Sequence, residues 1–247
     1  VGTRMPSERG KDWCRRLVLD LAQQVPDLTI VSGLAYGIDI VAHRAAIESG
    51  IPTIIVPAHG LDRIYPAVHR NVAIQTLDKG GIVTEYTCGT EPERFNFVAR
   101  NRIVAGMADA VVVVESKKKG GSLITADMAV DYGRDVFAVP GRVDDVCSAG
   151  CNDLIKNGAI LTDSPQDIVD VYEFNYNGEA SLEKATTNEV EETMWMNTDE
   201  IKELYNEGKT QADISRILNI SKQTISNRVK LIRTNFSFLL DNNVGQK

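Results

Sequence analysis

Residues 109–122 read DAVVVVESKKKGGS, a run of four valines followed by a cationic turn that contains two glycines. Four consecutive valines without polar alternation are typical of a strand that is buried on both faces of a sheet. The residues that follow predict a helix over 122–133. This strand–turn–helix succession indicates a βα unit, and the rest of the domain can be interpreted outward from it.

The same alternation of short apolar runs and helix-like stretches extends over residues 1–173. Strands are predicted at Leu28–Ser32, Thr53–Pro57, Gly81–Glu85, Asp109–Glu115 and Asp135–Val139, with helices near 7–25, 36–49, 66–79, 94–107 and 122–133. Consecutive βα units connect in a right-handed sense and produce a mostly parallel sheet. The predicted fold is therefore a three-layer α/β domain. We expect Gly2–Arg4 to follow a further strand upstream of Val1.

Charge divides the chain into three parts. The net charge is −5 over residues 1–178, −6 over 179–200 and +4 over 201–247, within a total of −7. Residues 174–198 lack apolar periodicity, which predicts an acidic linker. An acidic total disfavours bulk polyanion binding by the whole chain, but it leaves room for a local basic groove because local charge decides such binding.

Residues 199–240 are expected to form a separate, small all-α module with helix-turn-helix spacing. Asn219 occupies the tight turn before the third helix, a position that favours a residue tolerant of left-handed geometry. The outward side chains of that helix are types that contact phosphates or base edges: Lys222, Gln223, Thr224, Asn227 and Arg228. Two interpretations stay open, namely contact with duplex DNA and a packing module whose polar residues are solvated.

Three loops at the expected carboxyl ends of strands carry glycines or cationic side chains: Gly2–Arg4, Ser32–Asp39 and Lys117–Ser122. Ligands bind open α/β sheets at this edge, where backbone amides and helix N-termini favour anions. The loops together predict an anion site. The fingerprints G-x-G-x-x-G and G-x-x-x-x-G-K-[ST] are absent from the sequence, which disfavours a dinucleotide site or an ATPase.

We expect no cofactor and no metal site. His43, His59 and His69 lack the spacing of metal ligands and are expected in the core or behind the site. No G-x-S-x-G nucleophile elbow occurs. Glu85 and Glu115 end predicted strands at the site edge, and they leave acid–base chemistry open as an alternative.

The segment EPERFNFVARNR at residues 91–102 combines three arginines with two phenylalanines. If it is helical, Arg94, Phe97 and Arg100 share one face. Cations beside an exposed aromatic ring are typical of single-stranded nucleic-acid sites, where cations hold the backbone and rings stack on unpaired bases. The alternative is that Phe95 and Phe97 are core residues and the arginines are solvated.

The order of motifs along the chain closely resembles the DprA/Smf family, the DNA-processing proteins of natural transformation. The motifs are GTR at 2–4, SGLAYGID at 32–39, AH at 42–43, GLDRIYP at 60–66, TEY at 84–86, FVARNRIVAG at 97–106, GGSLITA at 120–126 and VPG at 139–141. The resemblance implies an extended Rossmann-like domain, single-stranded DNA binding, a homodimer, and loading of the RecA recombinase, without enzymatic activity.

Carried over position by position, the resemblance implies a set of DNA-binding residues. They are Gly2, Arg4, Ser32, Gly33, Ala35, Gly37, Arg94, Phe97, Arg100, Asn101, Lys119, Gly120, Gly121 and Ser122. Thr3 stands where the family has Ser, Arg94 where Lys is usual, and Gly120 where Ser is usual. The family's N-terminal helical domain is expected to be missing from this chain, and a β wing is not legible in the C-terminal module.

Two other function classes remain as alternatives. A nucleotide-binding hydrolase similar to the cytokinin-activating type uses a related fold, although its P-G-G-x-G-T-x-x-E run is absent from this sequence. The second alternative is a helix-turn-helix regulator that senses a ligand through its α/β domain. The sequence contains no signal-peptide pattern, no long apolar run and no C-x-x-C pair, so we expect a cytoplasmic protein without membrane contact, with free thiols.

Overall fold

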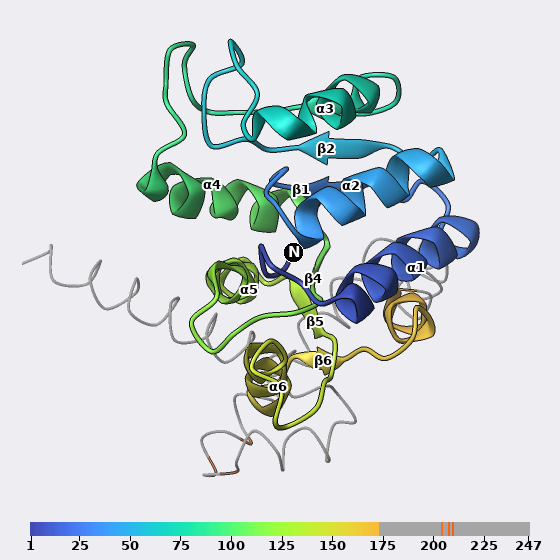
Figure 1. The fold of residues 1–247 in the computed structure, drawn as a ribbon. Coiled ribbons are helices and arrows are strands. Elements are labelled where there is room, and N and C mark those ends of the chain that lie inside the picture. Colours follow the sequence, from blue (N-terminus) through green and yellow to red (C-terminus); the bar gives the residue numbers. More distant parts are fainter. Residues whose placement is uncertain (173–203, 205–206, 208, 210–247) are drawn as a thin grey trace, which may run out of the picture. The chain divides into compact units, whose positions relative to one another are not determined.

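The computed structural model describes residues 1–172 together with Leu204, Glu207 and Lys209 (Figure 1). The chain divides into two compact units, Val1–Val171 and Tyr172–Lys247. The predicted acidic linker and the predicted polar face of the helix-turn-helix module lie outside the described residues. That face comprises Lys222, Gln223, Thr224, Asn227 and Arg228.

The first unit alternates strands and helices along the sequence (Figure 1). Its strands are β1 (Ile30–Ser32), β2 (Thr53–Ile55), β3 (Gly81–Ile82), β4 (Ala110–Val113), β5 (Asp135–Ala138) and β6 (Ile160–Leu161). Its helices are α1 (Glu8–Gln24), α2 (Ile38–Ser49), α3 (Arg70–Thr76), α4 (Arg94–Met107), α5 (Gly121–Asp131) and α6 (Ala149–Lys156), with a short 3₁₀ helix η1 (Ala67–His69) before α3.

The paired strands are parallel and form two three-stranded sheets, of order β1-β2-β3 and β4-β5-β6. The backbone of residues 1–3 runs alongside β4. The Val1 amino group donates to the Val112 carbonyl at 2.9 Å, and the Thr3 amide donates to the Glu115 carbonyl at 2.7 Å. Val1 itself therefore belongs to the strand-like segment that we expected upstream of it. The predicted mixed α/β fold with parallel strands is confirmed.

The valine run behaves as its sequence predicts. Val111 and Val113 are buried in a cluster with residues of α5, β5 and α6, whereas Val114 packs against Cys14 and Ile38 from α1 and α2. Neighbouring valines thus meet different helices, since successive strand side chains point to opposite faces. The valine run therefore joins the cluster that includes α5 and α6 to the cluster that includes α1 and α2.

Helices α1 and α2 lie side by side (Figure 1), where Val18 packs against Ala45 and Ala46. The start of α1 is capped by Ser7, whose hydroxyl accepts a hydrogen bond from the Gly10 amide at 3.0 Å. The end of α2 is closed by Gly50 in the left-handed conformation, with φ of 72°. Local capping therefore defines where α1 begins and where α2 ends.

Some predicted boundaries are wrong. The helix predicted over 66–79 is divided into η1 and α3. The strands predicted over Gly81–Glu85 and Asp109–Glu115 are reduced to β3 and β4, so Glu85 and Glu115 both lie beyond a strand. Helix α6 and strand β6 were not predicted because an eight-residue helix and a two-residue strand are too short to show periodicity. Among the described residues, no helix combines the length and apolar character that a membrane span requires.

Candidate nucleic-acid interface

A cation and two aromatic rings from distant parts of the chain meet beyond the strand ends. The guanidinium carbon of Arg4 lies 4.9 Å from the centre of the Phe97 ring. The Tyr65 ring lies on Phe97 as well, with centroids 5.9 Å apart and planes inclined by 54°. Tyr65 keeps 42% of its surface exposed. This cluster of Arg4, Tyr65 and Phe97 presents a cation and ring surface to solvent, which suits a phosphate and an unpaired base.

The first turn of α4 adds a second cation. Arg94 is exposed, and its guanidinium makes no hydrogen bond or ion pair within the described part of the chain. It precedes Phe97 by three residues, so the two side chains share a face of the helix. Phe95 is 77% exposed, and it therefore is not the core residue that one interpretation of the segment required. Phe97 itself is half-buried.

Arg4 is positioned by a close approach of two backbone segments. The Ile38 amide donates to the Thr3 carbonyl at 3.3 Å. A β-carbon at Gly37 would lie 2.2 Å from the same carbonyl oxygen, and Gly37 has a φ of +81°. Both the contact and the dihedral therefore require glycine at this position. Gly2 is confined in a similar way by Ile38 and the Glu115 carbonyl.

Arg100 is not at the surface. Its side chain is 3% exposed, and its guanidinium donates to the Gly33 carbonyl at 2.9 Å and to the Val56 carbonyl. Burial lowers the pKa of Arg100, while the nearby carboxylate of Asp39 opposes that shift and the charge of Arg4 adds to it. Arg100 thus joins the chain after β1 to the chain after β2, and its contact with DNA stays a prediction.

The glycine-containing loop after β1 is already bound by a carboxylate of the chain itself. The amides of Gly33 and Ala35 donate to Asp39 at 3.2 and 3.3 Å, and Ser32 and Asp39 are buried. These two amides, which we expected to approach a phosphate, therefore have an internal acceptor. A β-carbon at Gly33 would meet the Arg100 guanidinium at 2.3 Å, so a side chain at this position would displace Arg100.

A second carboxylate is bound at the start of α1, by the residue that caps the helix. The Glu115 carboxylate, 7% exposed, accepts a hydrogen bond from the Ser7 amide at 2.9 Å and another from the Ser7 hydroxyl. The other carboxylate considered for acid–base chemistry, Glu85, forms an ion pair with Arg102. Glu85 and Glu115 thus each have a partner, and they do not form a carboxylate pair with each other among the described contacts.

The N-terminus of α5 remains available. The first amides of a helix have no intrahelical acceptor, and the amides of Gly121 and Ser122 make no other hydrogen bond among the described residues. The Ser122 hydroxyl donates to Ser116 at 2.9 Å, and Gly120 packs on the same Ser116 hydroxyl. Lys119 is exposed just before this turn, as are Lys117 and Lys118. Of the three predicted anion loops, this one keeps both its amides and its cations.

Asn101 contacts the guanidinium of the neighbouring Arg100. Its side-chain oxygen accepts a hydrogen bond from Arg100 at 3.3 Å, and the residue is half-buried. It therefore helps to orient the buried guanidinium.

The three histidines lie in the interior, as predicted. His43 Nδ1 lies 2.7 Å from Thr53 Oγ1, whose own hydrogen is donated to the Ile30 carbonyl. Nδ1 must therefore carry the proton. Burial lowers the pKa of His43 to about 4, with Asp39 opposing the shift and Arg100 adding to it. His59 and His69 bond to backbone groups, and no group of three potential metal ligands occurs in the part of the chain that the structure describes.

The sequence analysis did not single out Tyr65, which contacts Phe97, or Tyr36, which is exposed in the loop after β1. Tyr36 is 48% exposed and stands edge-on to His69, with ring centroids 5.1 Å apart. Both tyrosines lie within motifs that were recognised, YP at 65–66 and AYG at 35–37. An aromatic residue inside a turn-rich motif is the signal that could have identified them, because turns at strand ends carry binding residues.

The four cysteines Cys14, Cys88, Cys147 and Cys151 are unpaired, as predicted. Burial raises the pKa of Cys14 to about 11 and that of Cys151 to about 12. These two thiols are therefore inert core residues rather than nucleophiles.

Comparisons with known proteins agree with this geometry. Residues 1–173 match the family model described as DNA recombination-mediator protein A. The DNA processing protein DprA of Streptococcus pneumoniae is 42% identical over 174 residues, which cover 70% of this chain and 61% of that protein. The protein Smf of Escherichia coli is 42% identical over 175 residues, covering 70% of this chain and 46% of that protein. The chain thus spans about half to three fifths of the length of these relatives.

Two solved structures are similar to the first unit. The X-ray structure of DprA from Streptococcus pneumoniae superposes with a TM-score of 0.63 over 69% of this chain and 59% of that one. The structure of DNA processing protein A from Helicobacter pylori, solved to explain its single-stranded DNA binding mode, has a TM-score of 0.62 at 32% identity, over 71% of this chain and 79% of that one. From the fold, the ordered motifs and these matches, the chain belongs to the DNA recombination-mediator protein A family, whose members include DprA and Smf.

Proposed function

We propose that this protein binds single-stranded DNA across the carboxyl ends of its strands. The observation that carries the proposal is the cluster of Arg4, Tyr65 and Phe97, in which a cation and two partly exposed rings are already in contact. Rings of this kind stack on unpaired bases of any sequence, which gives about 1–3 kcal/mol per base. In duplex DNA the base faces are stacked on one another, so the cluster favours a single strand.

Cations on both sides of the rings hold the phosphates. Arg4 and Arg94 serve on the α4 side, and Lys119 with the amides of Gly121 and Ser122 serves at the start of α5. Arg94 can hold a phosphate through two nitrogen donors, which lysine cannot do. Gly2, Gly33 and Gly37 shape the backbone around the site, and Ser32, Ala35, Arg100 and Asn101 hold it in place.

The biological role that we propose is protection of incoming single-stranded DNA and loading of the RecA recombinase during natural transformation, by a homodimer in the cytoplasm. The family's description as a recombination mediator supports this role, as does the single-stranded DNA binding described for the Helicobacter pylori relative. We propose that the protein has no enzymatic activity of its own, since the two candidate carboxylates Glu85 and Glu115 are engaged with Arg102 and Ser7.

We further propose that the two three-stranded sheets belong to one extended Rossmann-like, three-layer arrangement to which residues 1–3 contribute a strand beside β4. In this proposal residues 174–198 link the domain to a helix-turn-helix module at 199–240. Whether that module contacts duplex DNA is decided by the same experiment that tests the main proposal.

The experiment is a comparison of affinities. The full chain is titrated against a poly-pyrimidine single strand and a duplex of equal length, each at two salt concentrations. We expect tighter binding of the single strand at both. Preferred binding of the duplex would overturn the proposal and would favour a helix-turn-helix regulator. Hydrolysis of nucleoside monophosphates at enzymatic rates would instead favour the hydrolase.

A further inference from the structure

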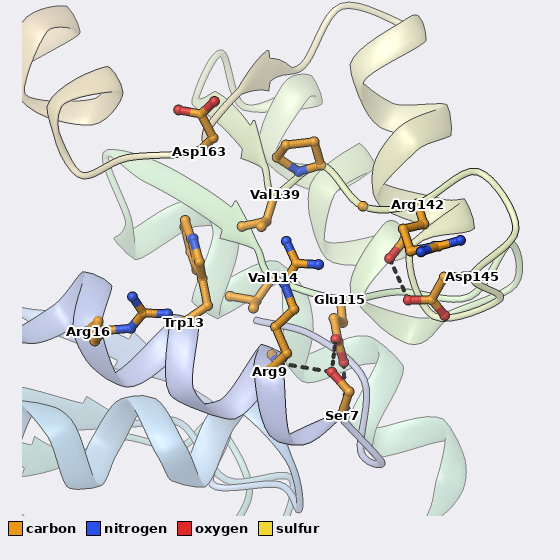
Figure 2. A pocket seen from close by; sticks show the side chains of 14 residues that line it. Ser7, Arg9, Trp13, Arg16, Val114, Glu115, Val139, Arg142, Asp145 and Asp163 are labelled. Atoms are coloured by element: carbon orange, nitrogen blue, oxygen red, sulfur yellow. Dashed lines mark hydrogen bonds between the residues drawn. The ribbon is translucent and has the colours of Figure 1, made fainter.

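A cavity separate from the DNA-binding residues lies where β4, β5 and β6 end. Its volume is about 320 Å³, and the first half of α1 forms one wall (Figure 2). Pockets for small ligands span roughly 300–1,000 Å³, so this cavity suits one compact molecule and not a length of strand. Arg4, Arg94 and Phe97 do not line it.

The carboxylates on the floor of the cavity already have donors. Glu115 accepts hydrogen bonds from Ser7. Asp145 accepts from the Cys147 amide and from the Ser148 hydroxyl, each at 2.9 Å. These hydrogen bonds stabilise both negative charges, so neither carboxylate depends on a cation from the opposite wall.

Arg9 is the cation left over. Of the three arginines that line the cavity, Arg16 is paired with Asp12 at 2.8 Å and Arg142 with Asp144 at 3.0 Å. The Arg9 guanidinium makes neither a hydrogen bond nor an ion pair within the described part of the chain. Figure 2 shows its side chain extending from α1 across the cavity toward Val139. A guanidinium in this position is a ready partner for an anionic group of a ligand.

Trp13 supplies a flat apolar wall beside that cation. It is half-buried, lies four residues after Arg9 and therefore shares its face of α1. In Figure 2 the indole stands next to Val139, and Asp163 lies beyond it at the same end of the cavity. The guanidinium of Arg9, the indole of Trp13 and the carboxylate of Asp163 follow one another along the cavity. They match, in that order, a phosphate, a base, and a hydrogen-bond donor on the sugar or the base.

We propose that this cavity binds a nucleoside monophosphate, with the phosphate on Arg9 and the base against Trp13. The ligand chemistry has two sources, a free mononucleotide and the 5′-phosphorylated end of a DNA strand. The site is distinct from the cluster of Arg4, Tyr65 and Phe97, and it holds the ligand without reacting with it. In this proposal Arg142 reaches the phosphate from the other side of the opening, where its pairing with exposed Asp144 is screened by solvent.

The sequence offers a direct probe. The chain has two tryptophans, Trp13 and Trp195, so in a Trp195→Phe background Trp13 is the only indole. Titration of this variant with dTMP is expected to give a saturable change in Trp13 fluorescence. Arg9→Gln in the same background is expected to weaken binding about tenfold or more, the loss typical of a charge-assisted hydrogen bond.

A matched control lies on the same helix. Lys11 pairs with Glu8 on the surface and does not line the cavity, so Lys11→Gln removes the same charge and is expected to leave the dTMP titration unchanged. No saturable change up to about 10 mM dTMP, or equal titrations for Arg9→Gln and Lys11→Gln, would overturn the proposal.

The two sources are then separated with short oligonucleotides. If the site holds a strand end, a 5′-phosphorylated oligonucleotide binds more tightly than its 5′-hydroxyl form, and Arg9→Gln removes the difference. If dTMP binds but the two oligonucleotides bind equally, the ligand is a free nucleotide. Phe97→Ala is expected to weaken strand binding while it leaves the dTMP titration intact, so failure of either proposed site is visible separately.

Discussion

The guanidinium of Arg4 stands over the ring of Phe97, 4.9 Å from its centre. Attraction between a cation and the face of an aromatic ring holds both side chains before any ligand arrives. A strand that binds here meets a phosphate partner and a stacking partner as one assembled unit. In the proposed site, the contributions of the two residues are expected to be separable by mutation, because one carries charge and the other does not.

Replacement of the ring tests the stacking contact. We expect Phe97→Ala to weaken single-strand binding by about 1–3 kcal/mol, or about 5- to 150-fold, because one base loses its stacking surface. Fluorescence anisotropy with a labelled poly-pyrimidine strand measures the change. Tyr132→Ala removes another exposed ring, 49% accessible at the end of α5, and should have no effect. Equal affinities for wild type and Phe97→Ala would remove Phe97 from the interface.

Replacement of the cation tests the phosphate contact. Each phosphate neutralised on a single strand contributes about −0.7 to the slope of log affinity against log salt. We expect Arg4→Ala to weaken binding and to flatten that slope by about 0.7, whereas Phe97→Ala leaves the slope nearly unchanged. The exposed Arg44 of α2 provides the control, since Arg44→Ala removes the same charge elsewhere. An unchanged affinity and slope for Arg4→Ala would move the DNA site away from the strand ends.

The buried arginine is expected to behave differently from the exposed ones. Arg100→Met leaves the carbonyls of Gly33 and Val56 without their donor, and each buried unsatisfied acceptor costs about 1–3 kcal/mol. For the two acceptors together we expect a loss of about 2–6 kcal/mol in the free energy of unfolding, measured by urea denaturation. The salt slope of the remaining DNA binding should stay unchanged. A slope flattened by about 0.7 would show that Arg100 reaches a phosphate after all.

Gly37 tests how Arg4 is held. A β-carbon there would lie 2.2 Å from the Thr3 carbonyl, at a φ of +81°. We expect Gly37→Ala to displace the segment that carries Arg4, with a cost of about 1–3 kcal/mol in stability and a loss of strand affinity. Gly81→Ala is the matched control, because a β-carbon at Gly81 meets no atom within 4 Å. Wild-type stability and affinity in Gly37→Ala would contradict the tight packing described above.

The buried histidine predicts a pH dependence of stability. Burial lowers the pKa of His43 from 6.5 to about 4, so the folded state favours the neutral ring. The contribution of His43 to the free energy of unfolding is therefore fully present above pH 6.5, the pKa of histidine in the unfolded chain. It is lost as the pH falls toward 4, because the unfolded chain then binds a proton that the folded chain does not. The shift corresponds to about 3 kcal/mol.

A substitution isolates this contribution from other titrating groups. In His43→Leu, the free energy of unfolding should fall less steeply between pH 6.5 and pH 4 than it does in wild type. Urea denaturation at several pH values measures both curves. If the two curves run parallel, another group is responsible for the acid sensitivity of the domain.

Helical periodicity predicted that Arg94, Phe97 and Arg100 share one face of α4. It did not predict how deeply each side chain is buried. The side chains run from exposed Arg94 through half-buried Phe97 to Arg100 at 3% exposure. Helical spacing fixes the direction of a side chain around the axis. How deeply each turn is buried depends on neighbouring segments, which here are the loops after β1 and β2. The sequence alone therefore predicted the helix and its face, and assigned one buried residue to the DNA.

The strand-end loops illustrate a second limit. Glycines after a strand predicted open backbone amides, and for α5 the structure is consistent with that expectation. For the loop after β1, Asp39 at the second position of α2 could have indicated an internal acceptor, since acidic residues favour helix starts. The pairing of Glu115 with Ser7 could not be found, because the two residues are distant in sequence and their contact depends on the assembled fold.

If the proposed site holds a strand, Asp39 is expected to influence how that strand moves. A cradle of backbone amides grips one phosphate at one point and so fixes the register of the chain that it binds. Here Asp39 occupies the two amides of the loop after β1. Apart from the amides at the start of α5, the contacts proposed for DNA are the ends of long side chains and the faces of rings. Such contacts accept the next nucleotide as readily as the present one. A strand held in this way can shift along the protein by single nucleotides without being released.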